Sequence, residues 1–246
     1  MKILACYSFK GGVGKTSTAV NMAWFSANAG YRTLLVDLDP QGSSTYCFRM
    51  KSRKKEWDKR FFRSAKTWLQ NIKGSDYDNL DVVPAQLSFR SFDIRLNDIK
   101  KSQLRLKKLI AGLESHYDRV ILDCPPSISL LSESVFNAAD MILVPIIPNP
   151  LSEQPLYQLY QFFQENKISK KKIYPFFSMV QAQKKVHKEG MQRIQENVPK
   201  MLNGVIPMMS DVEKMSEYRA PIGDFASKKP AFKHYKGLWS EVQKHL

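Results

Sequence analysis

Short apolar runs alternate with longer amphipathic stretches along this chain, a pattern typical of α/β proteins with a parallel sheet. The runs are rich in valine, isoleucine and leucine, as strands buried on both faces of a sheet are. They predict strands at residues 3–6, 33–37, 80–83, 118–123, 141–147, 173–180 and 205–207. The amphipathic stretches predict helices at residues 16–29, 100–116, 129–139, 151–165 and 230–245.

This alternation predicts a doubly wound α/β fold, in which a mostly parallel sheet is flanked by helices. The chain has 246 residues, and folds of this class reach that size around one core. Hydrophobic residues make up 43% and charged residues 25%, which are ordinary values for a globular protein and exclude a disordered chain. We therefore expect a single domain over residues 1–246.

The segment between the first strand and the first helix has the composition of a phosphate-binding loop. It carries three glycines and two lysines and reads Phe9-Lys10-Gly11-Gly12-Val13-Gly14-Lys15-Thr16-Ser17. At a helix N-terminus, free backbone N–H groups and the positive end of the helix dipole favour phosphate oxygens, and glycines let the backbone approach them. Lys15 adds a cation, and the Thr16 hydroxyl is suited to ligating Mg²⁺. The segment predicts a nucleoside triphosphate site.

The loop departs from the standard phosphate-loop pattern at one position, because that pattern places glycine where Phe9 stands. Lys10 followed by two glycines is the deviant Walker A form, and with it the chain resembles the ParA/MinD family of positioning ATPases. The resemblance implies a P-loop NTPase fold of the deviant Walker A type. It also implies that Lys10 reaches across a dimer interface to phosphates held by the partner subunit.

Two of the predicted strands lead into carboxylates. Asp37 and Asp39 end the strand at 33–37, and Asp123 ends the strand at 118–123. Ligands bind at the carboxyl ends of strands in this fold class, and Asp123 has the Walker B arrangement that would hold a magnesium-bound water opposite Thr16. The resemblance implies that Asp39 orients the attacking water and that Asp37 helps to hold the magnesium shell. The alternative is that both aspartates cap a turn before Pro40.

The resemblance extends over essentially the whole chain and implies slow, partner-stimulated hydrolysis of ATP with Mg²⁺ as cofactor. Lys10, Lys15 and Asp39 would be the catalytic residues. The backbone near Pro207 and Met208 would lie close to the adenine ring, although methionines there are also ordinary packing residues. The residues expected to contact the nucleotide are Lys10, Gly11, Gly12, Val13, Gly14, Lys15, Thr16, Ser17, Pro207 and Met208, and those expected at the metal are Thr16, Asp37 and Asp123.

The charge balance indicates a polyanionic partner. The chain carries 38 Lys and Arg against 23 Asp and Glu, a net charge of +15, and such a field attracts polyanions. The stretch at residues 49–66 interleaves cations with aromatic residues and is either a nucleic-acid or partner surface or a solvated loop and helix. Further candidate DNA contacts are Lys184, Lys185, Lys188, Arg193, Lys228, Lys229 and Lys233.

These features together predict a ParA-like ATPase that forms an ATP-sandwich homodimer and binds nucleoid DNA without sequence preference. A cargo-bound adaptor protein would stimulate hydrolysis, so that a plasmid, a chromosome region or a protein assembly is distributed. The chain begins directly with the strand before the loop, so we expect no DNA-reading helix-turn-helix domain before it. Three scattered cysteines fit a reducing cytosol, and we expect a cytoplasmic, nucleoid-associated protein.

Three other classes share the loop. A MinD-like membrane-cycling ATPase needs a C-terminal amphipathic helix, whereas the chain stops at Leu246 after a packing helix, so we expect no stable membrane association. An iron–sulfur reductase needs two cluster cysteines per subunit, and Cys47 and Cys124 lack suitable surroundings. A small-molecule ligase or kinase of the same superfamily would reveal itself by rapid, substrate-dependent turnover.

Overall fold

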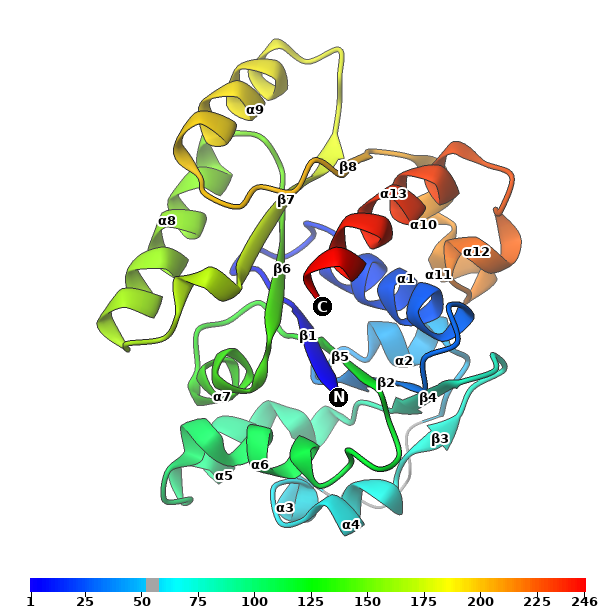
Figure 1. Ribbon diagram of the computed structural model, residues 1–246, viewed down its shortest axis with the longest axis vertical. Helices are drawn as coiled ribbons and strands as arrows, with labels where there is room; N and C mark the ends of the chain where they lie inside the picture. The colour runs from blue at the N-terminus through cyan, green and yellow to red at the C-terminus, as the bar shows by residue number, and fades with distance from the viewer. Residues whose placement is uncertain (52–57) are drawn as a thin grey trace.

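The computed structural model describes residues 1–51 and 58–246. These residues form an eight-stranded sheet in the order β3-β4-β2-β5-β1-β6-β7-β8, in which only the short β3 is antiparallel to its neighbour (Figure 1). The strands are β1 (Lys2–Cys6), β2 (Thr33–Asp37), β3 (Lys73–Gly74), β4 (Leu80–Val83), β5 (Arg119–Asp123), β6 (Met141–Ile146), β7 (Ile173–Val180) and β8 (Val205–Pro207).

Helices cover both faces of the sheet, so the described part of the chain has three layers (Figure 1). One face is covered mainly by α5 (Phe92–Asn97), α6 (Arg105–Ala111), α7 (Leu130–Ala138), α8 (Pro150–Glu165) and α9 (Lys185–Asn197). The other face is covered mainly by α1 (Lys15–Asn28) and α13 (Pro230–His245). The shorter helices are α2 (Ser43–Cys47), α3 (Asp58–Phe61), α4 (Ala65–Leu69), α10 (Ser210–Glu213), α11 (Met215–Tyr218) and α12 (Ile222–Phe225), and 3₁₀ turns lie at Leu87–Ser91, Ser102–Leu104 and Lys170–Lys172.

The two cores follow from the alternation of side chains along each strand. In β1, Ile3 and Ala5 pack into the core on one face, whereas Leu4 and Cys6 pack into the core on the other. The central strands β5 and β6 are buried at every residue, which explains why they read as continuous apolar runs. The predicted doubly wound fold is confirmed.

Two helical regions of the structure differ from the prediction. The helix expected at residues 100–116 is limited to α6, and Leu104, counted with its apolar face, is 46% exposed. The structure also contains α9 after β7, where no helix was predicted, because only Ile194 of the three residues buried along it, His187, Gly190 and Ile194, has an aliphatic side chain.

The basic aromatic stretch at 49–66 is only partly described, since residues 52–57 lie outside the described residues. Phe61 and Phe62 are buried and pack their rings against Phe92. These two rings are therefore core residues, and the idea that they stack on nucleic acid is wrong.

Candidate nucleotide-binding site

The loop between β1 and α1 has the backbone that its glycines predict. Gly14 is the N-cap of α1 and has φ +92°, and Gly12 has φ +69°, both in the left-handed region that favours glycine. A Cβ on Gly14 would stand 2.9 Å from the Ser178 hydroxyl at the end of β7. The loop therefore lies at a helix N-terminus against the carboxyl edge of the sheet, where an anion is favoured.

Lys15 is the first residue of α1, and its side chain is only 7% exposed. Its ammonium group donates a hydrogen bond of 3.2 Å to the Lys10 carbonyl oxygen, across the loop. Burial lowers the pKa of Lys15, and the carboxylates of Asp123 and Asp39 oppose that shift. The cation is thus held inside the loop, where the phosphates of a nucleotide would take over from the carbonyl as its partner.

Asp123 lies at the carboxyl end of β5, level with Cys6 of β1 and Asp37 of β2. Its carboxylate is fully buried, and burial raises its pKa to about 6 against the opposing effect of hydrogen bonds from Ser44 and Thr16. Among the described residues, Oδ1 of Asp123 has no hydrogen-bond partner. A buried carboxylate oxygen without a partner, next to a threonine hydroxyl, fits a magnesium-bound water, because Mg²⁺ keeps several waters and takes few protein ligands.

Asp37 is also fully buried, and its Oδ2 accepts hydrogen bonds from the Thr45 backbone N–H at 2.8 Å and the Thr45 hydroxyl at 2.7 Å. Burial, with the nearby charge of Asp123, raises the pKa of Asp37 to about 8. Its Oδ1 accepts from the Asp39 N–H, and Asp39 in turn accepts from the Gln41 N–H at 3.0 Å. The turn-capping contacts are therefore present, and they position both carboxylates at the sheet edge.

A pocket of about 390 Å³ opens over the phosphate loop. Asp39 and Gln41 line it at one side, and Pro207 and Met208 line it at another. The structure thus brings both residues expected near adenine to the same pocket as the loop. Lining residues that the sequence did not indicate are Ser178, Met179, Val212, Glu213 and Tyr235, which come from separate elements and carry no motif.

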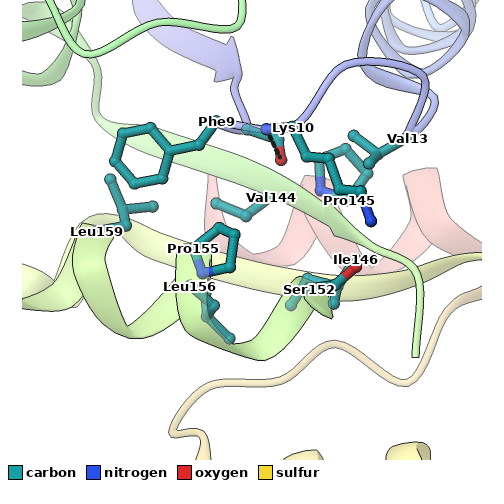
Figure 2. A pocket seen from close by; sticks show the side chains of 11 residues that line it. Phe9, Lys10, Val13, Val144, Pro145, Ile146, Ser152, Pro155, Leu156 and Leu159 are labelled. Atoms are coloured by element: carbon teal, nitrogen blue, oxygen red, sulfur yellow. Dashed lines mark hydrogen bonds between the residues drawn. The ribbon is translucent and has the colours of Figure 1, made fainter. Parts of the chain in front are cut away.

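Lys10 does not line this pocket. Together with Phe9 and Val13 it lines a separate cavity of about 10 Å³, room for a single water, between the loop and α8 (Figure 2). Pro155 and Leu156 of α8 form the opposite wall. Of the predicted phosphate contacts, Lys10 and Val13 are therefore the two that the structure places outside the nucleotide pocket, whereas Gly11, Gly12, Gly14, Lys15, Thr16 and Ser17 line it.

All three cysteines are buried and unbonded. Burial raises the pKa of the Cys6 and Cys124 thiols well above the ordinary value, and the charge of Asp123 raises both further. In the described part of the chain, no three His, Cys, Asp or Glu residues are grouped so as to hold a metal ion. These thiols are packing residues with little nucleophilic character.

The fold and this site define a P-loop nucleotide-binding protein. The family described as an AAA domain matches residues 1–174. The chain is 36% identical over 148 residues to the sporulation initiation inhibitor protein Soj of Bacillus subtilis, a match that covers 59% of this chain and 58% of that protein. It is 26% identical over 247 residues to the chromosome-partitioning ATPase Soj of Treponema pallidum, covering 98% and 96% of the two chains.

A putative plasmid partition protein from Borrelia burgdorferi, solved with AMPPNP, has the same fold, with a TM-score of 0.84 at 23% identity over 100% of this chain and 99% of that one. The chain belongs to the ParA/MinD family of ATPases, as the deviant Walker A loop predicted. The chain spans less than two thirds of the Bacillus relative's length.

Proposed function

We propose that this chain is a ParA-type partitioning ATPase that dimerises around two ATP molecules, binds DNA without sequence preference and distributes a cargo. The observation that carries the proposal is the position of Lys10. Lys10 does not line the pocket of the chain's own phosphate loop and is partly exposed, as expected of a lysine that serves a second subunit. The standard phosphate-loop motif specifies only one lysine, which corresponds to Lys15.

Within one subunit, different residues would bind the phosphates, hold Mg²⁺ and orient the attacking water. Lys15 and the backbone N–H groups of the loop bind the phosphates, and Thr16 with Asp123 would hold Mg²⁺, which neutralises phosphate charge when bound. Asp39 lines the pocket beside the loop and is only partly exposed, so it is placed to orient a water for in-line attack on the γ-phosphate. Asp37 holds the Asp39 backbone through its N–H.

Apolar side chains beside the loop support a dimer through this edge. Ile128 follows β5 and is 47% exposed, and Leu151 follows β6 and is 77% exposed. Because β5 and β6 are the two neighbours of β1, the segments that carry these side chains leave the sheet on either side of the strand that leads to Lys10. Exposed apolar groups around a functional cation are what a protein–protein interface presents.

Some of the cations of α9 that were expected to contact DNA pair with carboxylates of this chain instead. Arg193 forms a salt bridge with Glu153, and Lys185 pairs with Glu189 at 3.5 Å. Lys184 and Lys188 are exposed on the same helix. The net charge of +15 still supports contact with a polyanion such as DNA. An adaptor protein that stimulates ATP hydrolysis would release the protein from the DNA.

A membrane-cycling protein of the MinD type is the alternative. In residues 1–51 and 58–246, no helix combines the length and the apolar character that crossing a bilayer requires. The deciding experiment is a DNA gel shift beside sedimentation with anionic liposomes, each with ATP, with ADP and without nucleotide. We expect an ATP-dependent DNA shift, equal on unrelated sequences. ATP-dependent sedimentation without a DNA shift would replace the proposal by the alternative.

A further inference from the structure

A dense group of lysines lies at the amino end of β7, at the opposite edge of the sheet from the nucleotide pocket. In Figure 1 this is where the chain leaves α8 and enters β7. Lys172 immediately precedes β7, and Lys200 lies in the connection between α9 and β8. We refer to the group as the lysine surface, and it consists of Lys107, Lys167, Lys170, Lys171, Lys172 and Lys200.

Contacts between the segments show that the group is one surface. The Lys200 ammonium donates to the Lys171 carbonyl oxygen at 2.9 Å and to the Tyr174 hydroxyl at 3.2 Å, and lies 4.8 Å from the centre of the Tyr174 ring. Lys172 donates to the carbonyl oxygens of Phe136 and Asn137 at the end of α7. Burial lowers the pKa of Lys172, and the charge of Lys107 lowers it further.

These charges are uncompensated. Among the residues that the structure describes, none of the six lysines forms a salt bridge, whereas Arg32, Arg193 and Lys185 each do. Asp140 is the carboxylate whose charge raises the pKa of Lys172. Its Oδ2 already accepts a hydrogen bond from the Ile3 N–H at 2.8 Å. The lysine surface is therefore held by carbonyl and hydroxyl oxygens and keeps its positive field.

Two of these lysines have a strained backbone, as Arg49, Lys101 and Arg219 outside this surface also do. Lys167 and Lys200 both have φ +55°. Lys167 directly follows the C-cap of α8, where glycine is the usual residue, and Lys200 lies three residues after the end of α9. A side chain in that conformation costs about 1 kcal/mol or more. The chain thus carries lysine at two strained turn positions on the same surface, at the expense of stability.

We propose that the lysine surface is where this protein contacts the phosphates of duplex DNA. The inference rests on the DNA binding in the proposed function and assigns it to this edge instead of to the cations of α9. Around the five lysines of this surface at residues 167–200, the described residues 158–185 and 187–207 contain no exposed large apolar side chain, whereas Leu104, three residues before Lys107, is exposed. Five lysines without an inserting apolar group between them fit a phosphate backbone better than a bilayer interface.

The test compares two triple variants with the same change in charge. One carries Lys167→Glu, Lys170→Glu and Lys171→Glu, and the control carries Lys184→Glu, Lys185→Glu and Lys188→Glu on α9. Binding to duplexes of two unrelated sequences is measured by fluorescence anisotropy with ATP over a range of salt concentrations. Each phosphate contact contributes about 0.9 to the magnitude of the slope of log K against log salt. We expect the slope of the first variant to become shallower by about three units and that of the control by less than about one unit.

Equal or greater loss in the α9 variant would overturn the assignment, and absence of binding by the unchanged protein would instead refute the proposed function. Loss of binding to anionic vesicles, with DNA binding kept, would make this a membrane surface and would also overturn it. Lys167→Gly with Lys200→Gly separates folding from binding, because removing the strained side chains should raise the melting temperature while DNA affinity falls. Higher stability with unchanged DNA affinity would count against the inference.

Discussion

The Ser44 hydroxyl donates a hydrogen bond of 2.5 Å to Oδ2 of Asp123, which ties the start of α2 to the end of β5. Only one carboxylate oxygen is used in this way, since Oδ1 has no partner among the described residues. The relationship fixes the direction of the carboxylate beside Thr16 before any nucleotide arrives. Ser44 is therefore a positioning residue for the proposed metal site.

Asp123→Asn should remove the effect of Mg²⁺ on ATP affinity, because a neutral amide no longer attracts the hydration shell of the ion. Calorimetric titrations with Mg²⁺ and with EDTA should then give the same affinity. Ser44→Ala serves as the matched control and should weaken the magnesium effect by about tenfold or less, since one hydrogen bond to a charged group is lost. An unchanged magnesium effect in Asp123→Asn would exclude this carboxylate from the metal site.

Lys15→Gln should abolish ATP binding. The phosphates would keep their charge while the buried cation of the loop is gone, and the glutamine amide offers only a neutral donor in its place. Isothermal titration measures the loss directly, and circular dichroism confirms that the variant is folded. Binding heat like that of the unchanged protein would contradict the assignment of Lys15 to the phosphates.

Asp39→Ala should keep ATP binding and slow hydrolysis by 10²-fold or more, on the order of what a positioned general base contributes. The ATP-bound dimer would then persist. Size-exclusion chromatography with light scattering, run with ATP, should show the dimer for longer than with the unchanged protein. A variant that stays monomeric with ATP would indicate that Asp39 serves the interface rather than the water.

Lys10→Ala should leave nucleotide affinity unchanged but weaken the ATP dimer and remove stimulated hydrolysis, because in the proposed dimer the lysine acts on the partner's phosphates. Lys236→Ala, an exposed lysine on α13, is the control for loss of one charge. Sedimentation velocity with ATP measures the dimer fraction. If Lys10→Ala behaves like the control, the sandwich arrangement of two subunits is ruled out.

The stability of the nucleotide-free protein should fall as pH rises. The pKa values of Asp37 and Asp123 are raised to about 8 and about 6, so the folded chain binds these protons more tightly than the unfolded chain, in which the pKa is about 4. Folding therefore takes up protons, and their contribution to stability is lost as pH rises from about 4, where the unfolded chain releases its protons, to about 8, where the folded chain has released them too. Scanning calorimetry should show a lower melting temperature at the upper end of this range.

Asp123→Asn tests the origin of that pH dependence, since it removes one of the two titrating groups and the charge that raises the pKa of the other. The slope of melting temperature against pH should become shallower. A slope equal to that of the unchanged protein would assign the effect to other groups.

Seven of the eight described strands and the phosphate loop were predictable because each has a local signal, whereas the two-residue β3 has none. The predicted bounds of β2, β4, β7 and β8 match the structure, since buried parallel strands show as apolar runs with polar ends. The approach of Pro207 and Met208 to the loop was available only through the family resemblance. Ser178 and Tyr235 could not be found in either way, because they meet the loop only when β7 and α13 pack against it.

The lysine surface escaped sequence analysis for a similar reason. Lys170–Lys172 form a visible run, but Lys107 and Lys200 join it only through the fold. The run at 184–188 was equally visible, and sequence alone could not show that Glu189 and Glu153 pair with cations of α9. Charge compensation is a property of three-dimensional neighbours, which composition does not contain.

Strand β7 connects the two edges of the molecule, since the lysine surface lies at its first residue and Ser178 near its last residue lines the nucleotide pocket. Its eight residues span roughly 26 Å at about 3.3 Å per residue. Electrostatic influence through physiological salt fades over about 8 Å, so the γ-phosphate is too distant to change the field felt by DNA. In the proposed dimer, ATP would act on DNA binding by joining two lysine surfaces in one particle.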